Sequence, residues 1–183
     1  MRRSLTPDGR LLVLISGPIA SGKTTVARAL AEITRLHGHQ AASIDMDDVV
    51  AMVAGDDWSR VHHRDRILAT QVAATMIEKL FDLGLELVTV AGSTLANREW
   101  EELLEPLVSR PKPFYVLLRV SNEEAVRRAQ SDPTRTKTKD AAFIAKVASQ
   151  IDWGVIRDHH VDTITDGLDS AEVARMLARE ILE

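Results

Sequence analysis

Residues 11–24, which read LLVLISGPIASGKT, decide the fold of this chain. The run Leu11–Ile15 is continuously apolar, which is typical of a buried parallel strand. The residues behind it, Gly17–Thr24, match the spacing G-x-x-x-x-G-K-[ST] of a Walker A loop, in its expected place between a strand and a helix. We therefore predict that this stretch binds the phosphates of a nucleoside triphosphate.

The residue types of this loop fit the chemistry of a triphosphate. Gly17 and Gly22 let backbone N–H groups turn toward phosphate oxygens, and the following helix directs its positive end at the same anion. Lys23 is expected to reach the β- and γ-phosphates and Thr24 to coordinate Mg²⁺, so the predicted cofactors are ATP and Mg²⁺. The donor-site residues predicted from this loop are Gly17, Ala20, Ser21, Gly22, Lys23, Thr24 and Thr25.

The composition fits a single domain over residues 1–183 and argues against several partners. The chain has 183 residues, of which 45% are hydrophobic, and a net charge of −4. That charge gives no general attraction to nucleic acid or to an anionic membrane, and the apolar runs are far shorter than a membrane span. The chain has no cysteine and no indicated secretory leader, which predicts a cytoplasmic protein without disulfides or thiolate sites. The composition does not indicate an oligomeric state.

Apolar runs alternate with helical patterns along the chain. The runs predicted as strands are residues 11–15, 41–44, 86–90, 114–120 and 161–164. The longest predicted helix has its apolar face at Leu68, Val72, Met76, Leu80 and Leu83. This alternation predicts an α/β fold of three layers, a doubly wound parallel sheet with helices on both faces. Ligands bind at the carboxyl ends of the strands in such sheets, so we sought reactive residues behind each strand.

Three carboxylates, Asp45, Asp47 and Asp48, follow the second predicted strand. Beside a bound triphosphate, one such group can hold Mg²⁺ through water and another can accept the proton of an attacking hydroxyl. We prefer Asp47 as this base and assign Asp45 to the metal together with Thr24, but the reverse order stays open. The alternative is that Asp47 or Asp48 only caps the next helix.

The acceptor of the phosphoryl group is expected near the ends of the second and third strands. Ala91 stands where hydrolysing NTPases carry a metal-binding aspartate, so that acid is either missing or supplied by Asp45. The region around Trp58 offers an aromatic ring and polar anchors for a small molecule, although each residue there is alternatively an ordinary surface residue. The predicted acceptor residues are Asp47, Arg60, His62, Gly92, Ser93 and Arg98.

A basic and polar segment follows the fourth strand. Between Arg127 and Lys139, five basic residues stand against the single acid Asp132, and the stretch shows no apolar face. We predict a lid at about residues 128–140 that closes over the phosphates, excludes water and stabilises charge with its arginines. A solvated basic loop is the alternative. Arg127 and the loop at Asp166, behind the fifth strand, are assigned to the donor site.

In order and spacing, these motifs resemble those of the small P-loop kinases. The resemblance is carried by residues 17–24, 44–47, Gly92, the arginine-rich segment and the closing strand and helix at residues 161–170. The chain is most similar to the shikimate and gluconate kinases and to the chloramphenicol phosphotransferase-like, AAA_33-type kinases. The resemblance implies a five-stranded parallel sheet of order 2-3-1-4-5 with a lid, and transfer of the ATP γ-phosphate to a hydroxyl of a small molecule.

The resemblance also implies roles for individual residues. Asp47 and Asp45 match the base and the Mg²⁺ partner, and Arg128 or Arg135 matches a lid arginine that acts with Lys23 in catalysis. The sequence Ala91-Gly92-Ser93 lacks the longer glycine run of shikimate kinases, which argues against shikimate as the acceptor. A metabolite or a hydroxylated antibiotic remains open.

Three functions compete on these observations. The first is an ATP-dependent O-phosphotransferase that acts on a small molecule. The second is a nucleoside or nucleotide kinase, which would use the same donor site with a base-stacking acceptor pocket. The third is an NTPase switch or motor module, which the short chain and the missing acid at Ala91 make less suitable.

Overall fold

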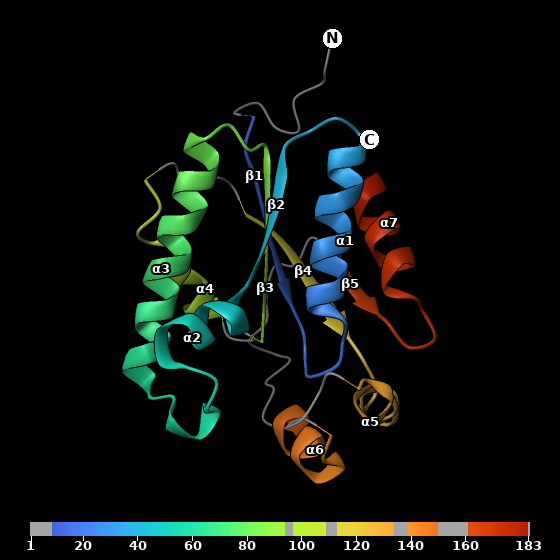
Figure 1. Cartoon of the computed structure of the whole chain (residues 1–183). Helices are drawn as coiled ribbons and strands as arrows, with labels where there is room; N and C mark the ends of the chain where they lie inside the picture. The colour runs from blue at the N-terminus through green and yellow to red at the C-terminus, as the bar shows by residue number, and fades with distance from the viewer. Residues whose placement is uncertain (1–8, 94–96, 109–112, 134–138, 150–160, 183) are drawn as a thin grey trace.

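The computed structural model describes residues 9–93, 97–108, 113–133, 139–149 and 161–182. Its centre is a five-stranded sheet in the order β2-β3-β1-β4-β5, with every neighbouring pair parallel (Figure 1). The strands are β1 (Leu11–Ser16), β2 (Ala41–Asp45), β3 (Leu87–Gly92), β4 (Pro113–Arg119) and β5 (Val161–Ile164). This order confirms the predicted P-loop NTPase fold.

The central strand β1 is buried on both faces because it lies between β3 and β4 with helices above and below. Its side chains alternate between the two faces, as the pleat of a strand requires. Val13 and Ile15 join one hydrophobic cluster, whereas Leu12 and Leu14 join the other, and all four are fully buried. The continuous apolar run in the sequence therefore reflects two cores that share one strand.

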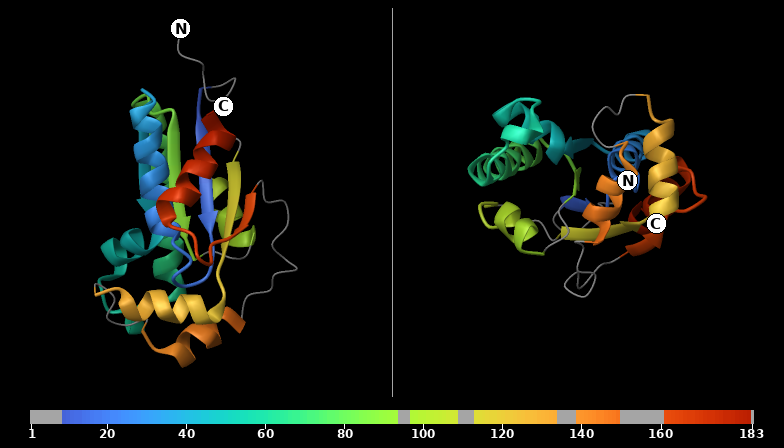
Figure 2. Two further views of the ribbon diagram at one scale, coloured as in Figure 1. Left: turned by 90° about the vertical axis from the view of Figure 1, so that its right-hand side faces the viewer. Right: turned by 90° about the horizontal axis from the view of Figure 1, so that it is seen from below.

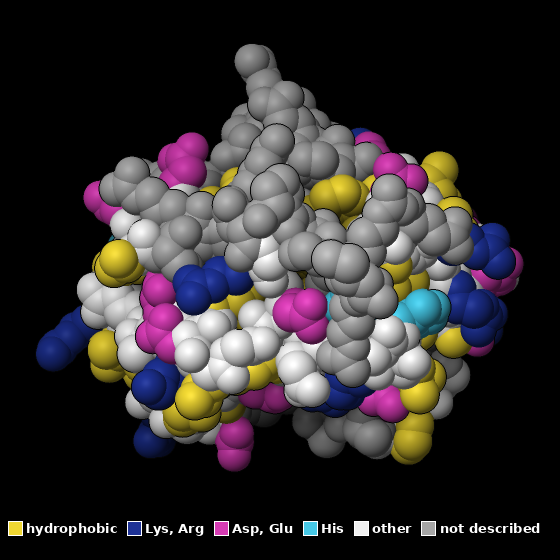
Figure 3. All heavy atoms as spheres, turned by 90° about the horizontal axis from the view of Figure 1, so that it is seen from above, with side chains coloured by type: hydrophobic (Ala, Val, Ile, Leu, Met, Phe, Trp, Pro, Cys, Tyr) yellow, Lys and Arg dark blue, Asp and Glu magenta, His cyan; other side chains and the backbone are white. Residues whose placement is uncertain are grey.

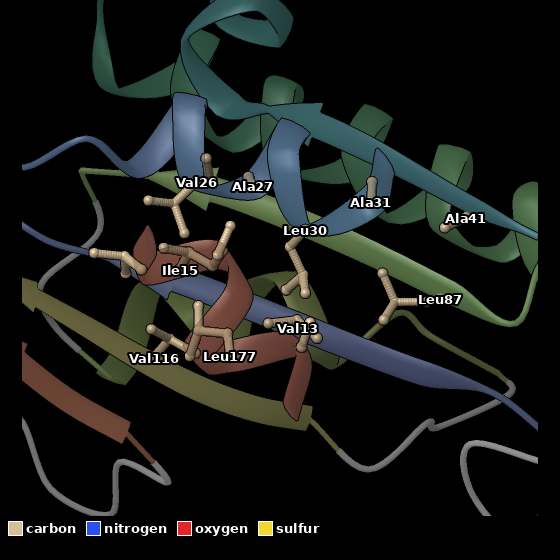
Figure 4. Packing of buried hydrophobic residues seen from close by; sticks show 14 of the residues in the cluster. Val13, Ile15, Val26, Ala27, Leu30, Ala31, Ala41, Leu87, Val116 and Leu177 are labelled. Atoms are coloured by element: carbon tan, nitrogen blue, oxygen red, sulfur yellow. The ribbon is translucent and has the colours of Figure 1, made fainter. Parts of the chain in front are cut away.

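The first core lies between the sheet and the helices α1 (Lys23–Leu36) and α7 (Ser170–Leu182), which run side by side. Figure 4 shows Val26 and Leu30 of α1 and Leu177 of α7 directed at the side chains of the sheet. Helix α1 stops as predicted at Gly38, which adopts a φ of +87° and donates its N–H to the carbonyl of Arg35. This core holds α1, the helix that the phosphate-binding loop leads into.

The second core lies under α2 (Met46–Ala54), α3 (His63–Asp82) and α4 (Asn97–Leu104). The predicted apolar face of α3 is right only in part, because Val72, Met76 and Leu80 are partly buried against this core. Leu68 is 45% and Leu83 67% exposed. The side chains of α3 that are buried against the sheet are Ala69, Ala73, Ala74, Ile77 and Phe81. Small alanines bring the helix axis close to the sheet, so the larger residues of the predicted stripe lie at the margins of the contact.

Helices α5 (Asn122–Ser131) and α6 (Ala141–Ser149) lie across the carboxyl end of the sheet (Figures 1 and 2). A small cluster of Ala20, Ala125, Ala129 and Ile144 joins them to the loop behind β1. The lid prediction needs correction here, because residues 128–131 belong to α5 and Ala129 is fully buried. Residues 134–138 lie outside the described part of the chain, and α6 was not predicted.

The end of the molecule at the amino ends of the strands carries acidic and basic side chains next to one another, as Figure 3 shows from above. Among the described helices, none is both long enough and apolar enough to cross a membrane. The strand ends that carry the predicted reactive residues lie at the other end of the sheet, below β1 in Figure 1.

The stability of the fold is expected to depend on the contact between α1 and the sheet. Leu30 is fully buried in the first core, so Leu30→Ala should lower the free energy of unfolding by about 2–5 kcal/mol. Leu36 on the same helix is 77% exposed, and Leu36→Ala should change it by less than about 0.5 kcal/mol. Urea unfolding followed by circular dichroism measures both, and equal effects of the two variants would contradict this packing.

Candidate functional site

The candidate site lies at the carboxyl end of the sheet, where β1, β2 and β3 end side by side. In register, Asp45 of β2 is the neighbour of Ala91 of β3, and Gly92 is the neighbour of Ser16 of β1. The segment Gly17–Thr24, called the P-loop below, leaves the central strand at this edge and enters α1. Side chains far apart in the sequence thus meet where an open α/β sheet binds its ligands.

The backbone of the P-loop adopts conformations that side chains disfavour. Gly22 has a φ of +93° and is the N-cap of α1, and Ala20 has a φ of +62°. A Cβ at Gly17 would lie 2.4 Å from the carbonyl oxygen of Leu118 and 2.5 Å from Oγ of Ser21, which is too close for any side chain. The predicted glycines are therefore needed here for space and for φ.

Two polar side chains of the P-loop lie inside it. Lys23 Nζ donates a hydrogen bond to the carbonyl oxygen of Pro18 over 2.8 Å, so the lysine lies along the loop that it is predicted to serve. The buried Oγ of Ser21 has no hydrogen-bond partner in the described part of the structure. An unsatisfied buried hydroxyl costs stability, as does the positive φ of Ala20, and such features collect at functional sites.

A short chain of hydrogen bonds joins the P-loop to β2. Thr24 Oγ1 donates to Oδ2 of Asp45 over 2.6 Å, and the backbone N–H of Asp47 donates to Oδ1 of Asp45 over 2.9 Å. Asp45 is thus the N-cap of α2, and the alternative that Asp47 or Asp48 serves as this cap is wrong. The Thr24 hydroxyl and the Asp45 carboxylate form a pair of oxygen ligands of the kind that Mg²⁺ prefers.

Asp47 lies in the first turn of α2, beside this pair. Burial of its carboxyl group among neighbouring side chains, followed by the charge of Asp45, raises the pKa of Asp47, while Lys23 and Arg66 act to lower it. The residue as a whole is nevertheless exposed to solvent. Asp48 is directed elsewhere, since its carboxylate pairs with Arg28 on the surface over 3.2 Å. Asp47, and not Asp48, is therefore the second carboxylate of the site.

Sequence reasoning missed Arg66, a residue of α3 that acts on Asp47. Its guanidinium carbon lies 5.8 Å from the centre of the Trp58 ring, a distance at which cation and ring attract. Trp58 begins a 3-10 turn, Trp58–Arg60, between α2 and α3. One helical turn separates His62 and Arg66 on the chain, and Arg66 is the residue of α3 whose charge acts on the carboxylate. A search for cations three to four residues beyond the predicted pocket residues would have found it.

The other predicted acceptor residues have simpler surroundings. Arg60 is 83% exposed and pairs with Asp57 over 3.3 Å, and His62 is the exposed N-cap of α3, where its N–H donates to Asp65. Gly92 is buried at the end of β3, and Ser93 behind it is exposed. Arg98 falls in α4, but its side chain lies outside the described part. No contact tests the substrate role of these residues, which stays a prediction.

A second contact that the sequence did not indicate lies where β1 enters the P-loop. The indole N–H of Trp100 in α4 donates to Oγ of Ser16 over 2.9 Å, and both residues are buried. Ser16 is the last residue of β1 and directly precedes Gly17. This hydrogen bond ties α4 to the start of the P-loop, and the helical spacing of Trp100 in the sequence indicated only a core position.

The remaining predicted residues lie on the α5 side. Arg128 donates to the carbonyl oxygens of Ala20, Thr165 and Leu168, whereas Arg127 is 68% exposed and pairs with Glu124. Asp166 accepts the N–H of Ser121 over 2.9 Å and so holds the loop behind β5 against the start of α5. Arg135 lies outside the described residues. The donor-site role of Arg127 and Asp166 therefore stays a prediction.

The chain matches a known protein family over most of its length. The AAA_18 family, described as an AAA domain, matches residues 13–151, and the chain belongs to this family. The match runs from β1 through α6 and so includes the P-loop, both carboxylates and α5. The predicted membership of a small P-loop kinase group is confirmed at the level of family and fold. No curated protein sequence matches the chain.

Solved structures show the same fold at low sequence identity. The APS kinase of Mycobacterium tuberculosis, in complex with AMPPNP and APS, has a TM-score of 0.67 and 18% identity over 93% of this chain and 96% of its own. The shikimate kinase of Acinetobacter baumannii, in complex with shikimate, has a TM-score of 0.60 and 20% identity over 93% and 92%. The tunicamycin resistance protein of Deinococcus radiodurans has a TM-score of 0.60 and 15% identity over 94% and 95%.

The raised pKa of Asp47 predicts a pH-dependent loss of stability in magnesium-free buffer. A carboxyl group whose pKa is higher in the folded protein favours folding in its protonated form, so its contribution is present below the usual value of 3.8 and is lost as pH rises through the folded pKa. Asp47→Asn should therefore be more stable than the natural protein at pH 7. The gain should be below about 1 kcal/mol, because solvent screens the partly exposed group.

Urea unfolding at pH 7 and at pH 3.5 measures this difference. The gain should shrink at the lower pH, where the natural carboxyl group is also protonated. Asp48→Asn is the control, since its carboxylate is 72% exposed and should give no such gain. A lower stability of Asp47→Asn at pH 7 would contradict the electrostatic description of the site.

Proposed function

We propose that this protein is an ATP-dependent phosphotransferase that moves the γ-phosphate of ATP to a hydroxyl of a small molecule. The hydrogen-bonded chain from Thr24 through Asp45 to Asp47 carries this proposal. It sets one carboxylate against the P-loop and a second at the first turn of α2, beside Lys23. This is the division of labour that phosphoryl transfer needs, with one acid for the metal and one for the acceptor.

The donor end of the site is the P-loop and the start of α1. Its N–H groups and the helix dipole would hold the phosphates of ATP, and Lys23 would leave the carbonyl of Pro18 to reach them. Bound Mg²⁺, held by Thr24 and Asp45, would neutralise charge on the phosphates. ATP and Mg²⁺ are thus the proposed cofactors, and the cytoplasm, where both abound, the proposed compartment.

The acceptor is proposed to occupy the space beside Asp47, near the start of α2 and the end of β3. Asp47 would orient the acceptor hydroxyl and take its proton as the bond to phosphorus forms. Its raised pKa suits this task, because a stronger base accepts the proton more readily. Ala91 and Gly92 bring no bulky side chain to this space, and Ser93, Arg60, His62 and Arg98 are its proposed lining.

Placement and charge would do most of the catalytic work, since phosphoryl transfer asks for little covalent chemistry from the protein. Lys23 would stabilise the charge of the transferring group. Arg135, in the basic segment behind α5, is proposed to assist when the lid covers the phosphates and excludes water. A single domain over residues 1–183, with this lid behind Ser131, is the proposed organisation.

A nucleoside or nucleotide kinase is the second candidate, and the contact between Trp58 and Arg66 favours it. The half-buried ring of Trp58 contacts Arg66, and the charge of Arg66 acts on Asp47. An aromatic ring beside a cation would suit an acceptor that carries a nucleobase and a phosphate. The two candidates share the donor site and differ only in the acceptor.

A coupled assay for ADP identifies the acceptor and tests both candidates. Purified protein with Mg-ATP is offered sugars, shikimate-like acids, adenosine phosphosulfate, nucleosides, nucleoside monophosphates and hydroxylated antibiotics, one at a time. A small hydroxylated molecule outside the nucleosides should accelerate ADP formation. Acceleration by nucleosides or their monophosphates alone would favour the second candidate, and the absence of any nucleotide binding by calorimetry would contradict both.

Replacement of Lys23 or Asp47 should abolish most of the transfer while the fold persists. Lys23→Ala should lower kcat by about 10²–10³, because it removes charge stabilisation in the transition state. Asp47→Asn should lower kcat by about 10²–10⁴, because it removes the base. Lys79→Ala on the exposed face of α3 and Asp48→Asn are the matched controls. Near-normal turnover of Lys23→Ala and Asp47→Asn would rule out this mechanism.

Asp45→Asn separates the structural role of Asp45 from its proposed metal role. Asparagine caps a helix as well as aspartate, so the start of α2 should stay intact and the midpoint of urea unfolding nearly unchanged. The loss of a negative ligand should raise the Mg²⁺ concentration for half-maximal ATP turnover by roughly tenfold or more. A titration of Mg²⁺ at fixed ATP measures this shift, and an unchanged titration would remove Asp45 from the metal site.

A further inference from the structure

The P-loop has an outer side as well as an inner one. A loop that turns its N–H groups toward an anion must turn carbonyl oxygens of the same peptide units away from it. Those oxygens are hydrogen-bond acceptors that need partners once they are out of water. In the structure the outer carbonyls of Ala20 and Ser21 face α5 and the loop behind β5, so their partners come from outside the P-loop.

Arg128 of α5 is the largest of these partners. Its Nη1 donates to the carbonyl oxygen of Ala20 over 3.4 Å and to Oγ1 of Thr165 over 3.2 Å. Its Nη2 donates to the carbonyl oxygens of Thr165 and, over 3.4 Å, of Leu168. The guanidinium thus bridges the P-loop and the loop behind β5.

Glu124, one turn earlier on α5, holds this guanidinium in place. Arg128 Nε donates to Oε1 of Glu124 over 2.7 Å, and the two side chains are only 20% and 13% exposed. Arg127 and Arg128 together lower the pKa of Glu124 to about 2, so the carboxylate stays charged at any pH of interest. The neighbouring Arg127 shares Glu124 but is 68% exposed, and the hydrogen bonds of its Nε and Nη2 both go to this carboxylate.

Thr165 completes the connection. The residue is only 2% exposed. Its hydroxyl donates to the carbonyl oxygen of Arg119 over 2.9 Å and lies 3.4 Å from the carbonyl oxygen of Ser21. The apolar cluster of Ala20, Ala125, Ala129 and Ile144 packs α5 against the same part of the P-loop. Polar and apolar contacts therefore act together on residues 20–21, where the φ of Ala20 is positive.

We propose that Arg128 is a positioning residue for the nucleotide, one that fixes the phosphate-binding shape of the P-loop by binding its outer carbonyls. The inference rests on the proposed function and gives Arg128 a role other than contact with the transferring phosphate. All three nitrogens of the guanidinium already have protein partners on the outer side of the loop. The N–H of Ser21, which shares a peptide unit with the Ala20 carbonyl, donates to the carbonyl oxygen of Pro18 over 3.3 Å, so this unit is held at both ends.

The positioning role makes a specific prediction for binding. When the loop adopts its binding shape for only a fraction of the time, the apparent Kd rises in inverse proportion to that fraction. Arg128→Ala should therefore weaken Mg-ADP and the non-hydrolysable analogue Mg-AMPPNP by the same factor, about tenfold. A residue that contacts the γ-phosphate would weaken Mg-AMPPNP alone, because ADP lacks that group.

Isothermal titration calorimetry of the full chain with each nucleotide measures the two constants. Arg35→Ala is the matched control, because Arg35 also binds a carbonyl oxygen, that of Ala41, and a glutamate, Glu32, at the far end of α1. It should lower the urea midpoint but leave both Kd values within about twofold of the natural protein. Thr165→Val, which removes one hydroxyl and keeps the side-chain shape, should raise both Kd values together by a smaller factor, about threefold.

The possible outcomes separate the alternatives. Parallel weakening of both nucleotides by Arg128→Ala, without such weakening by Arg35→Ala, supports the positioning role. Loss of AMPPNP affinity alone, or unchanged affinity for both, overturns it. If Arg128→Ala does not fold, unchanged affinities in Thr165→Val overturn it instead, and parallel weakening supports it. If the natural protein binds neither nucleotide, the proposed function itself fails.

Discussion

The conformation of residues 17–22 is the constraint on which the rest of the structure depends. To turn N–H groups inward, the loop leaves no room for a side chain at Gly17 and takes a positive φ at Ala20 and Gly22. It also buries a hydroxyl of Ser21 that has no partner in the described residues. A short peptide would not hold this shape, because each of these features costs free energy. The molecule holds it by anchoring one end of the loop in the fully buried strand β1 and the other end in α1, whose apolar face packs on the sheet.

The anchors come from three directions, and each serves a different part of the site. Where β1 enters the loop, Trp100 donates a hydrogen bond to Ser16, the last residue of the strand. On the side of β2, Asp45 accepts the hydroxyl of Thr24 and at the same time caps α2, so a shift of the P-loop would also disturb the first turn that carries Asp47. On the outer side, Arg128 and Thr165 bind the carbonyls. Donor loop, base and α5 are therefore parts of one connected arrangement, and the proposed chemistry needs such a rigid arrangement.

The fold could be predicted from the sequence largely because its signals are local. Runs of apolar residues mark the strands, Gly38 marks the end of α1, and the spacing of the loop glycines marks the P-loop. The apolar face of α3 could not be predicted, since which side of a helix is buried depends on how closely alanines such as Ala69 and Ala73 let it approach the sheet. The same holds for the contacts of Trp100 with Ser16 and of Arg128 with Ala20, whose partners lie 84 and 108 positions away in the sequence. Asp45 was expected to act on the metal, but its capping role appears only when β2 is seen to end directly at α2.

The place of the acid in the sheet favours transfer to an acceptor over hydrolysis. Hydrolysing NTPases carry a metal-binding aspartate at the end of the strand that corresponds to β3. Here Asp45 is the neighbour of Ala91 in register, so the aspartate lies on the next strand, whose backbone is about 4.8 Å away. Ala91 and Gly92 leave that end without a large side chain. Under the proposed function, the acceptor would approach the γ-phosphate at this end of the sheet, near Asp47 and Ser93. The proposed transfer to an alcohol would therefore use an aspartate on β2, Asp45, in place of the aspartate that hydrolysing NTPases carry on β3.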